Sequence, residues 1–263
     1  MPVKIYIFFI ALLISSACYA QQLYIPLEYQ SAYEDNTRSP DGKPGPDYWQ
    51  NHSDYKIKVN INTETGVLSG TEEIIYYNQS PDTLDKIVFR LYPNIFKKDA
   101  MRDFPYKSSE DQEGMKISQL TAGKKSYNTE SDTSLEYSGT NLSIKDITVL
   151  PGKQVNIKVS WEFRIPGDVG IRMGRNKPDV FFIAYWYPQI AVYDDRDGWD
   201  VTEYTGNAEF YNDFNTYDVK ITIPNNFGVW ATGELQNPQD VLSQNILSKY
   251  SDALDSDSLV NII

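Results

Sequence analysis

The single histidine of this 263-residue chain, His52, limits the catalytic chemistry that the sequence can support. A zinc-protease motif of the H-E-x-x-H kind needs two histidines one helical turn apart, so this chain cannot supply that motif by itself. A Ser-His-Asp triad would have to use His52, and the sequence has no G-x-S-x-G segment to hold the nucleophilic serine. Because His52 lies between Asn51 and Ser53 at the edge of a polar segment, we expect an ordinary exposed side chain.

The acidic run at residues 194–200 has some of the spacing of a calcium loop. Asp195 and Asp197 precede Gly198 as in an EF-hand, but the two positions where such a loop needs acids hold Tyr193 and Tyr204. We therefore interpret the run as a surface loop, and an irregular ion site at residues 194–200 stays an open alternative.

Paired carboxylates in an aromatic neighbourhood could serve glycoside hydrolysis, and Glu203, Glu209 and Asp213 are the candidates. With 36 acidic residues in the chain, some must fall near aromatic residues by chance, so the non-catalytic interpretation is favoured. The glycines of residues 167–174 are not followed by the Lys-Ser/Thr pair of a phosphate-binding loop. We assign no catalytic, cofactor-binding or metal-ligating residue to this chain.

The balance of charge argues against nucleic acid as a partner. The 24 basic and 36 acidic side chains give a net charge of -12, which repels phosphate backbones, and no Lys/Arg cluster overrides it locally. Twenty tyrosines and five tryptophans favour half-buried, pleated surfaces. Three Asn-x-Ser sequons, at Asn51, Asn78 and Asn141, would matter only in a eukaryotic secretory pathway.

Residues 1–20 have the form of a secretory signal peptide, with Lys4, an apolar run at residues 5–14 and a small-residue cleavage site ending at Ala20. The apolar run is shorter than the roughly 18 to 20 residues of a membrane span, and no later stretch approaches that length, so no transmembrane segment is expected. We predict export to the periplasm, cell surface or medium. A lipid anchor at Cys18 is the less favoured alternative, because Ser15 stands where lipoprotein signals usually have Leu. Cleavage would leave a mature chain without cysteine and without disulfides.

The remaining chain predicts an all-β fold. Residues 21–50, rich in Pro, Gly, Asp and Ser, are expected to form an extended polar leader. Residues 51–237 are expected to form an antiparallel β-sandwich, since strand patterns recur between turn signals without intervening helices. The predicted strands are residues 55–61, 68–77, 84–91, 154–165 and 217–223, with one short strand at 115–120 among the loops of 97–138.

Residues 238–263 predict a helical segment followed by the start of a further strand. Val241, Leu242, Ile246 and Leu247 share one face of a helix that opens at Pro238, and no other part of the mature chain predicts a helix as well. Residues 259–263 are strand-like and end abruptly, so we expect the chain to be a fragment.

Residues 181–194, FFIAYWYPQIAVYD, resemble the W-Y-P-x-x-A-V-Y-D signature of M1-family zinc metallopeptidases, the aminopeptidase N-like enzymes, and in particular the exported Bacteroidetes group. Segments that look like the later strands of the same domain follow in the same order, at residues 206–211, 217–224 and 231–238. Residues 68–72 and 89–94 match its opening strands. The resemblance covers the chain from Trp49 to the C-terminus.

The resemblance implies a saddle-shaped N-terminal β domain that packs on a thermolysin-like catalytic domain and walls its cleft. Zinc and the catalytic residues belong to that missing C-terminal catalytic domain, whose substrates are peptides, so this chain should hold no cofactor and should be inactive alone. Many family members have Gln where Tyr185 stands, and classical members have an acid or amide where Tyr187 stands. For Tyr185 and Tyr187 we therefore expect at most a cleft-lining role.

The alternative is a free-standing secreted β-sandwich module that binds a glycan or peptide through exposed aromatic side chains. It predicts a chain that folds alone with a closed last strand.

Overall fold

The computed structural model describes residues 24–106, 112–167, 172–176, 179–208 and 210–262. The predicted signal peptide, with Cys18, lies outside these residues. The chain divides into two compact units, Met1–Pro224 and Asn225–Ile263, and each is described by itself. Among the described residues, none of the helices is both long and apolar enough to cross a membrane.

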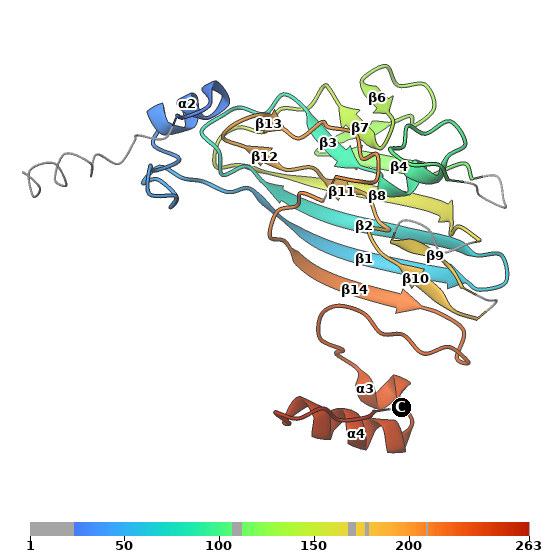
Figure 1. Cartoon of the computed structure of the whole chain (residues 1–263). Helices are drawn as coiled ribbons and strands as arrows, with labels where there is room; N and C mark the ends of the chain where they lie inside the picture. Colours follow the sequence, from blue (N-terminus) through green and yellow to red (C-terminus); the bar gives the residue numbers. More distant parts are fainter. Residues whose placement is uncertain (1–23, 107–111, 168–171, 177–178, 209, 263) are drawn as a thin grey trace, which may run out of the picture. The chain divides into compact units, whose positions relative to one another are not determined.

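A six-stranded sheet forms the larger layer of the first unit (Figure 1). Its neighbours pair antiparallel except for the last strand in the sequence, which runs parallel to the first. In spatial order the strands are β14 (Thr216–Thr222), β1 (His52–Asn62), β2 (Val67–Tyr77), β8 (Gln154–Arg164), β4 (Lys116–Ala122) and β5 (Lys125–Tyr127).

The alternating sequence of β1 accounts for its place in the sheet. Tyr55, Ile57 and Val59 are buried while Lys56 and Lys58 are exposed, so one face of the strand is apolar and the other polar. The tight turn to β2 ends at a glycine with a backbone φ of 69°, a conformation that residues with a side chain rarely adopt.

A four-stranded sheet packs over the apolar face of the first, and a single buried cluster contains side chains from both sheets. The side chains of β3 are all buried. In spatial order the strands are β11 (Gln189–Ile190), β3 (Ile87–Arg90), β7 (Asn141–Ile144) and β6 (Leu135–Ser138), and the 3-10 helix η1 (Tyr92–Phe96) follows β3.

Two short ribbons and one helix complete the first unit. The ribbons are β9 (Met173–Arg175) with β10 (Phe181–Ile183), and β12 (Tyr193–Asp194) with β13 (Gly198–Trp199). The helix is α2 (Leu27–Glu34).

The prediction of an all-β, antiparallel fold with a short helical segment near the C-terminus is confirmed, with one parallel pair of strands added. Strands were expected at residues 55–61, 68–77, 154–165 and 217–223, and β1, β2, β8 and β14 occupy these positions. The expected strand 84–91 is reduced to β3, since Leu84 forms only an isolated bridge with Val149.

Two predictions about the less regular parts were wrong. The leader at residues 21–50 is not wholly extended, because it contains α2, in which only Ala32 is buried. Residues 97–138 hold β5 and the strand β6 as well as β4. Strands of three or four residues show too little alternation to be recognised from sequence.

The second unit contains two helices, α3 (Pro238–Val241) and α4 (Gln244–Leu254), where the sequence predicted one. The break comes at Leu242, whose ψ of 141° is extended, and Ser243 then occupies the N-cap position that Ser favours. The strand expected at residues 259–263 is not formed at residues 259–262, where Leu259 is 98% exposed. A strand needs a neighbour to accept its backbone hydrogen bonds, and these residues have none within the described part of the unit.

Candidate functional site

The segment 181–194 forms the centre of a cluster of aromatic rings in the first unit. We call it the aromatic cluster; its members are Tyr55, Tyr92, Trp161, Tyr185, Trp186, Tyr187, Tyr204, Phe210 and Tyr217.

Tyr185 lies at the tightest point of the cluster. Its ring stacks on Phe210 with centroids 3.5 Å apart, and it meets the edge of Tyr92 at 5.4 Å. The backbone φ of Tyr185 is 54°, a left-handed conformation that is uncommon for a bulky residue and is held here by the packing on both sides. The half-buried ring is therefore fixed in orientation.

Tyr187 lies on the other side of Trp186, whose indole packs against Trp161 at 5.7 Å. The Tyr187 hydroxyl donates a 2.9 Å hydrogen bond to the hydroxyl of Tyr217, and its ring meets the edge of Tyr55. Burial raises the pKa of Tyr187 far above its usual range, so this hydroxyl stays protonated and acts as a hydrogen-bonding group.

A buried carboxylic acid, Glu72, lies beside these tyrosines. It is 1% exposed, neither of its oxygens has a hydrogen-bond partner among the described residues, and in its ionised form it would raise the pKa values of Tyr55 and Tyr187. Desolvation raises the pKa of Glu72 well above its usual range, so the group is neutral when buried. Sequence reasoning missed it, although the alternation of β2 places Glu72 in phase with Leu68 and Ile74 on the core face.

Two surface hollows are lined by residues other than Tyr185 and Tyr187. One is lined by residues 100–106, and the other lies on the polar face of the six-stranded sheet, around Lys58, Thr71 and Ser160. A cleft-lining role for the two tyrosines stays a prediction.

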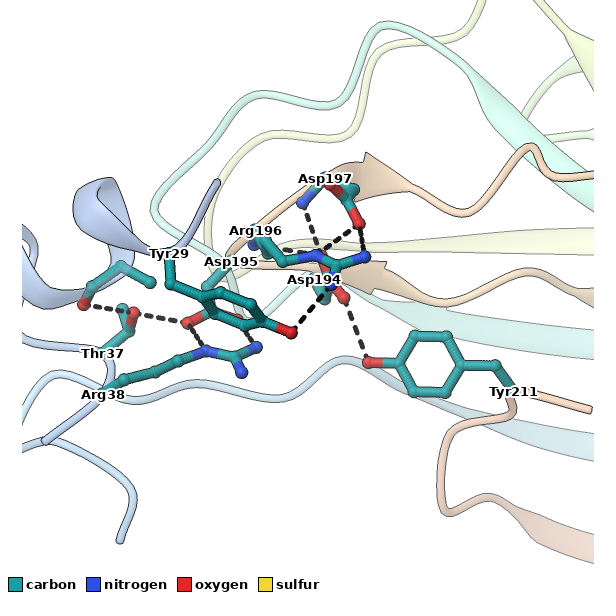
Figure 2. Close-up of polar contacts among 9 residues, drawn as sticks. Tyr29, Thr37, Arg38, Asp194, Asp195, Arg196, Asp197 and Tyr211 are labelled. Atoms are coloured by element: carbon teal, nitrogen blue, oxygen red, sulfur yellow. Dashed lines mark hydrogen bonds and ion pairs between the residues drawn. The ribbon is translucent and has the colours of Figure 1, made fainter. Parts of the chain in front are cut away.

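The acidic run 194–200 begins at the last residue of β12 and contains β13. The carboxylates of Asp194, Asp195 and Asp197 contact protein groups (Figure 2). Asp194 accepts hydrogen bonds from the backbone N–H groups of Arg196 and Asp197, at 3.0 and 2.8 Å, and from the Tyr211 hydroxyl at 3.1 Å. Asp197 pairs with Arg196. Among the described residues, no group of three or more His, Cys, Asp or Glu side chains is arranged to hold a metal ion.

Asp195 binds the N-terminal segment. Its carboxylate accepts two hydrogen bonds from Arg38, at 2.9 and 2.6 Å, and one from the Thr37 hydroxyl at 2.6 Å. The Tyr29 ring of α2 lies between the guanidinium groups of Arg38 and Arg196, each 5.2 Å from the ring centroid (Figure 2). Hydrogen bonding to Arg38 lowers the pKa of Asp195, which keeps the carboxylate charged.

A second ion pair, between Arg90 and Asp200, is more deeply buried and was also missed by sequence reasoning. Arg90 is 5% exposed at the end of β3, and it also donates to the side-chain oxygen of Asn141 and the backbone carbonyl of Thr202. The pair thus fastens the segment after β13 to the four-stranded sheet. No local sequence signal links two residues 110 positions apart.

The three carboxylates considered for glycoside hydrolysis do not form a described pair. Glu203 accepts a 2.6 Å hydrogen bond from the hydroxyl of Ser138, and Glu209 lies outside the described residues. Burial raises the pKa of Asp213 to about 7, with Asp194 adding to the increase and a hydrogen bond from Gln50 opposing it.

The sequon asparagines are structural residues in this fold. Asn51, Asn78 and Asn141 are at most 4% exposed. Their amide groups donate to the Tyr76 hydroxyl and to the backbone carbonyls of residues 149 and 201, at 2.8 to 2.9 Å. Since a glycan must project into solvent, the folded domain presents none of these three amides for modification.

His52 is half-buried rather than exposed. It lies in β1 and stacks on Tyr77 with centroids 4.4 Å apart. That contact gives it a packing role.

No protein-family model and no curated protein matches the chain. Among solved structures, it is similar to an M1 zinc metallopeptidase from Deinococcus radiodurans, at 14% identity and a TM-score of 0.34, over 74% of this chain and 38% of that one. A variant of that protein bound to a Tyr-Ser-Ala substrate gives the same identity and TM-score, over 74% and 39%. A putative nutrient binding protein from Legionella pneumophila is similar at 14% identity and a TM-score of 0.30, over 45% of this chain and 40% of that one. The chain thus spans about two fifths of the length of these proteins.

Proposed function

We propose that this chain is the non-catalytic N-terminal β domain of an exported, M1-like zinc aminopeptidase, and that it packs against a catalytic domain whose cleft it helps to wall. One observation carries the proposal. The residues that resemble the M1 signature, Trp186-Tyr187-Pro188 onward to Asp194, are not a surface loop but the part of the chain that joins the aromatic cluster to the core.

Half-buried rings at the margin of the cluster supply the packing surface. Tyr187 and Tyr217 are held by core contacts on one side, and Tyr217 is 45% exposed. Phe182, in the adjoining strand β10, is 56% exposed. Fixed, partly exposed aromatic side chains lose little conformational entropy on contact with a partner, which suits a domain interface.

The zinc chemistry of the proposed parent lies outside this chain. The sequence has one histidine, and His52 is stacked on Tyr77, so two histidines of an H-E-x-x-H motif would have to come from the catalytic domain. There the metal would activate water for attack on the first peptide bond.

The test begins by reading the gene beyond the codon for Ile263 for an in-frame H-E-x-x-H with a downstream glutamate. The extended protein and residues 21–263 alone are then assayed for zinc content and for hydrolysis of aminoacyl p-nitroanilides. We expect one zinc per extended chain, and hydrolysis that is lost when the first histidine of the motif is replaced by Ala. Residues 21–263 alone should show neither property.

A stop codon directly after Ile263, or a longer gene without the motif, would contradict the proposal. The chain would then be better explained as a binding module, and a glycan and peptide array would be the next measurement.

A further inference from the structure

Strand β14 (Thr216–Thr222) is the last strand at one end of the six-stranded sheet. It pairs with β1 along its whole length, and no strand of the described part of the chain pairs with its other side (Figure 1). Such an edge presents a row of backbone N–H and C=O groups to whatever strand can reach it.

The edge has none of the backbone features that natural proteins use to block pairing. Seven consecutive residues of β14 match β1 without a bulge, and none of them is proline. On the core face, Tyr217 and Val219 remain 45% and 40% exposed, although they lie in register with the buried Tyr55 and Ile57 of β1. Tyr217, Val219 and Ile221 thus continue the apolar face of the sheet to its edge.

The sequence of β14, TYDVKIT, is complementary to itself when it is aligned antiparallel around Val219. Directly opposite residues of an antiparallel pair point to the same face. On the polar face, this alignment places Asp218 of each copy opposite Lys220 of the other copy. On the apolar face Tyr217 lies opposite Ile221, and Val219 lies opposite itself.

Neighbouring registers lack this match. A one-residue shift of the centre to Asp218 or to Lys220 sets identical charges opposite each other, which is unfavourable. An alignment centred between two residues, such as Asp218 and Val219, sets those two residues opposite each other. It places the apolar face of one copy beside the polar face of the other. The alignment centred on Val219 therefore pairs opposite charges and joins the two apolar faces at once.

We propose that β14 is a self-association edge, through which two copies of this chain form a symmetric dimer with one continuous sheet. The two-fold axis passes through the Val219 pair, so each copy contributes the same surface. Within one chain, Lys56 lies 3.9 Å from Asp218, but both side chains are more than 60% exposed. Such a weak contact leaves Asp218 able to pair with the second copy.

Sedimentation equilibrium over a concentration series, on residues 21–263 and on any longer natural chain, tests the proposal. We expect a concentration-dependent dimer. Asp218→Lys and Lys220→Asp should each weaken dimerisation about tenfold, because each change turns two cross-strand attractions into two repulsions. The double variant carrying both changes should restore the dimer, since it reverses the charges and keeps their complementarity.

Two further variants separate this edge from general charge effects. Glu162→Lys makes the same charge change as Asp218→Lys on the polar face of β8, away from the edge, and should leave the dimer unchanged. Val219→Lys places like charges on the two-fold axis and should abolish the dimer, while circular dichroism shows that the variant remains folded. A protein that stays monomeric up to its solubility limit would overturn the proposal, and so would a dimer that neither single charge change weakens.

Discussion

Arg38 and Asp195, which are 157 positions apart, form a two-point hydrogen bond between the N-terminal segment and the β12–β13 ribbon. The Asp195 side chain is 6% exposed and that of Arg38 is 34% exposed, so the acid is the buried partner. Thr37 donates to the same carboxylate. One acid of the ribbon therefore holds the segment that follows α2.

Replacing Asp195 with Asn should release this segment. The change removes the charge from the acceptor of three hydrogen bonds, and we expect the free energy of unfolding to fall by about 1 kcal/mol. This value is smaller than that for a fully buried pair because Arg38 is partly exposed. Trypsin should then cut between Arg38 and Ser39 faster than in the wild type, as measured by mass spectrometry. Acid should act similarly, since the stability from the lowered pKa of Asp195 is lost as pH falls through that pKa.

Asp197→Asn is the matched control, because the Asp197 carboxylate pairs with the exposed Arg196 in the same loop. Equal cleavage rates in the two variants would show that Asp195 does not hold the segment.

Replacing Asp200 with Asn should destabilise the domain by about 3 to 5 kcal/mol, because it leaves the Arg90 guanidinium buried without its counter-charge. The double variant Arg90→Met with Asp200→Asn should lose less free energy of unfolding than the sum of the losses in the two single variants. Urea unfolding followed by tryptophan fluorescence measures these free energies. Glu136→Gln removes an ion pair with Lys145 whose side chains are about half exposed, and should cost less than about 0.5 kcal/mol. Losses of similar size for Asp200→Asn and Glu136→Gln would contradict the structural role of the buried pair.

Replacing Glu72 with Gln should stabilise the domain increasingly as pH rises. The pKa of Glu72 is raised in the folded state from its ordinary value of 4.5, so the folded protein binds a proton that the unfolded chain releases. Wild-type stability should therefore be highest below that ordinary value and fall by about 1.4 kcal/mol per pH unit up to the folded-state pKa. The Gln variant should lack this slope in urea unfolding at a series of pH values.

The adjacent Glu73 provides the control, because it faces solvent and pairs with Lys158. Its pKa is lowered, so the stability it contributes is present above its ordinary pKa and is lost as pH falls. Parallel curves of stability against pH for the wild type and Glu72→Gln would show that Glu72 is not neutral in the core.

Adding a methyl group at Gly70 should disturb the packing of Trp161. A Cβ at Gly70 would lie 2.6 Å from Cζ2 of Trp161 and 2.9 Å from the backbone oxygen of Lys58, closer than atoms pack. We expect Gly70→Ala to cost about 1 to 3 kcal/mol and to shift tryptophan emission to longer wavelength. Gly228→Ala, which meets no atom within 4 Å, is the control. An unchanged spectrum in Gly70→Ala would show that Trp161 does not pack over Gly70.

Long strands could be predicted from sequence because their evidence is local. The alternation of Tyr55, Ile57 and Val59 sets which side chains of β1 face the core, whatever strand lies beside it. The same alternation in β2 already places Glu72 on the core face, so this buried acid was open to prediction. Helix α2 escaped prediction because its residues bury only Ala32 and show no apolar stripe.

The sequence by itself determined the all-β class, the positions of β1, β2, β8 and β14, and the impossibility of a two-histidine zinc motif within this chain. Only the tertiary structure decided that β14 runs parallel to β1, that Asp195 binds Arg38, and that the sequon asparagines are buried. The physical reason is the distance along the sequence between the residues that interact. Burial of alternate side chains is written into neighbouring residues, whereas the choice between distant partners depends on the summed packing and hydrogen bonding of the whole core.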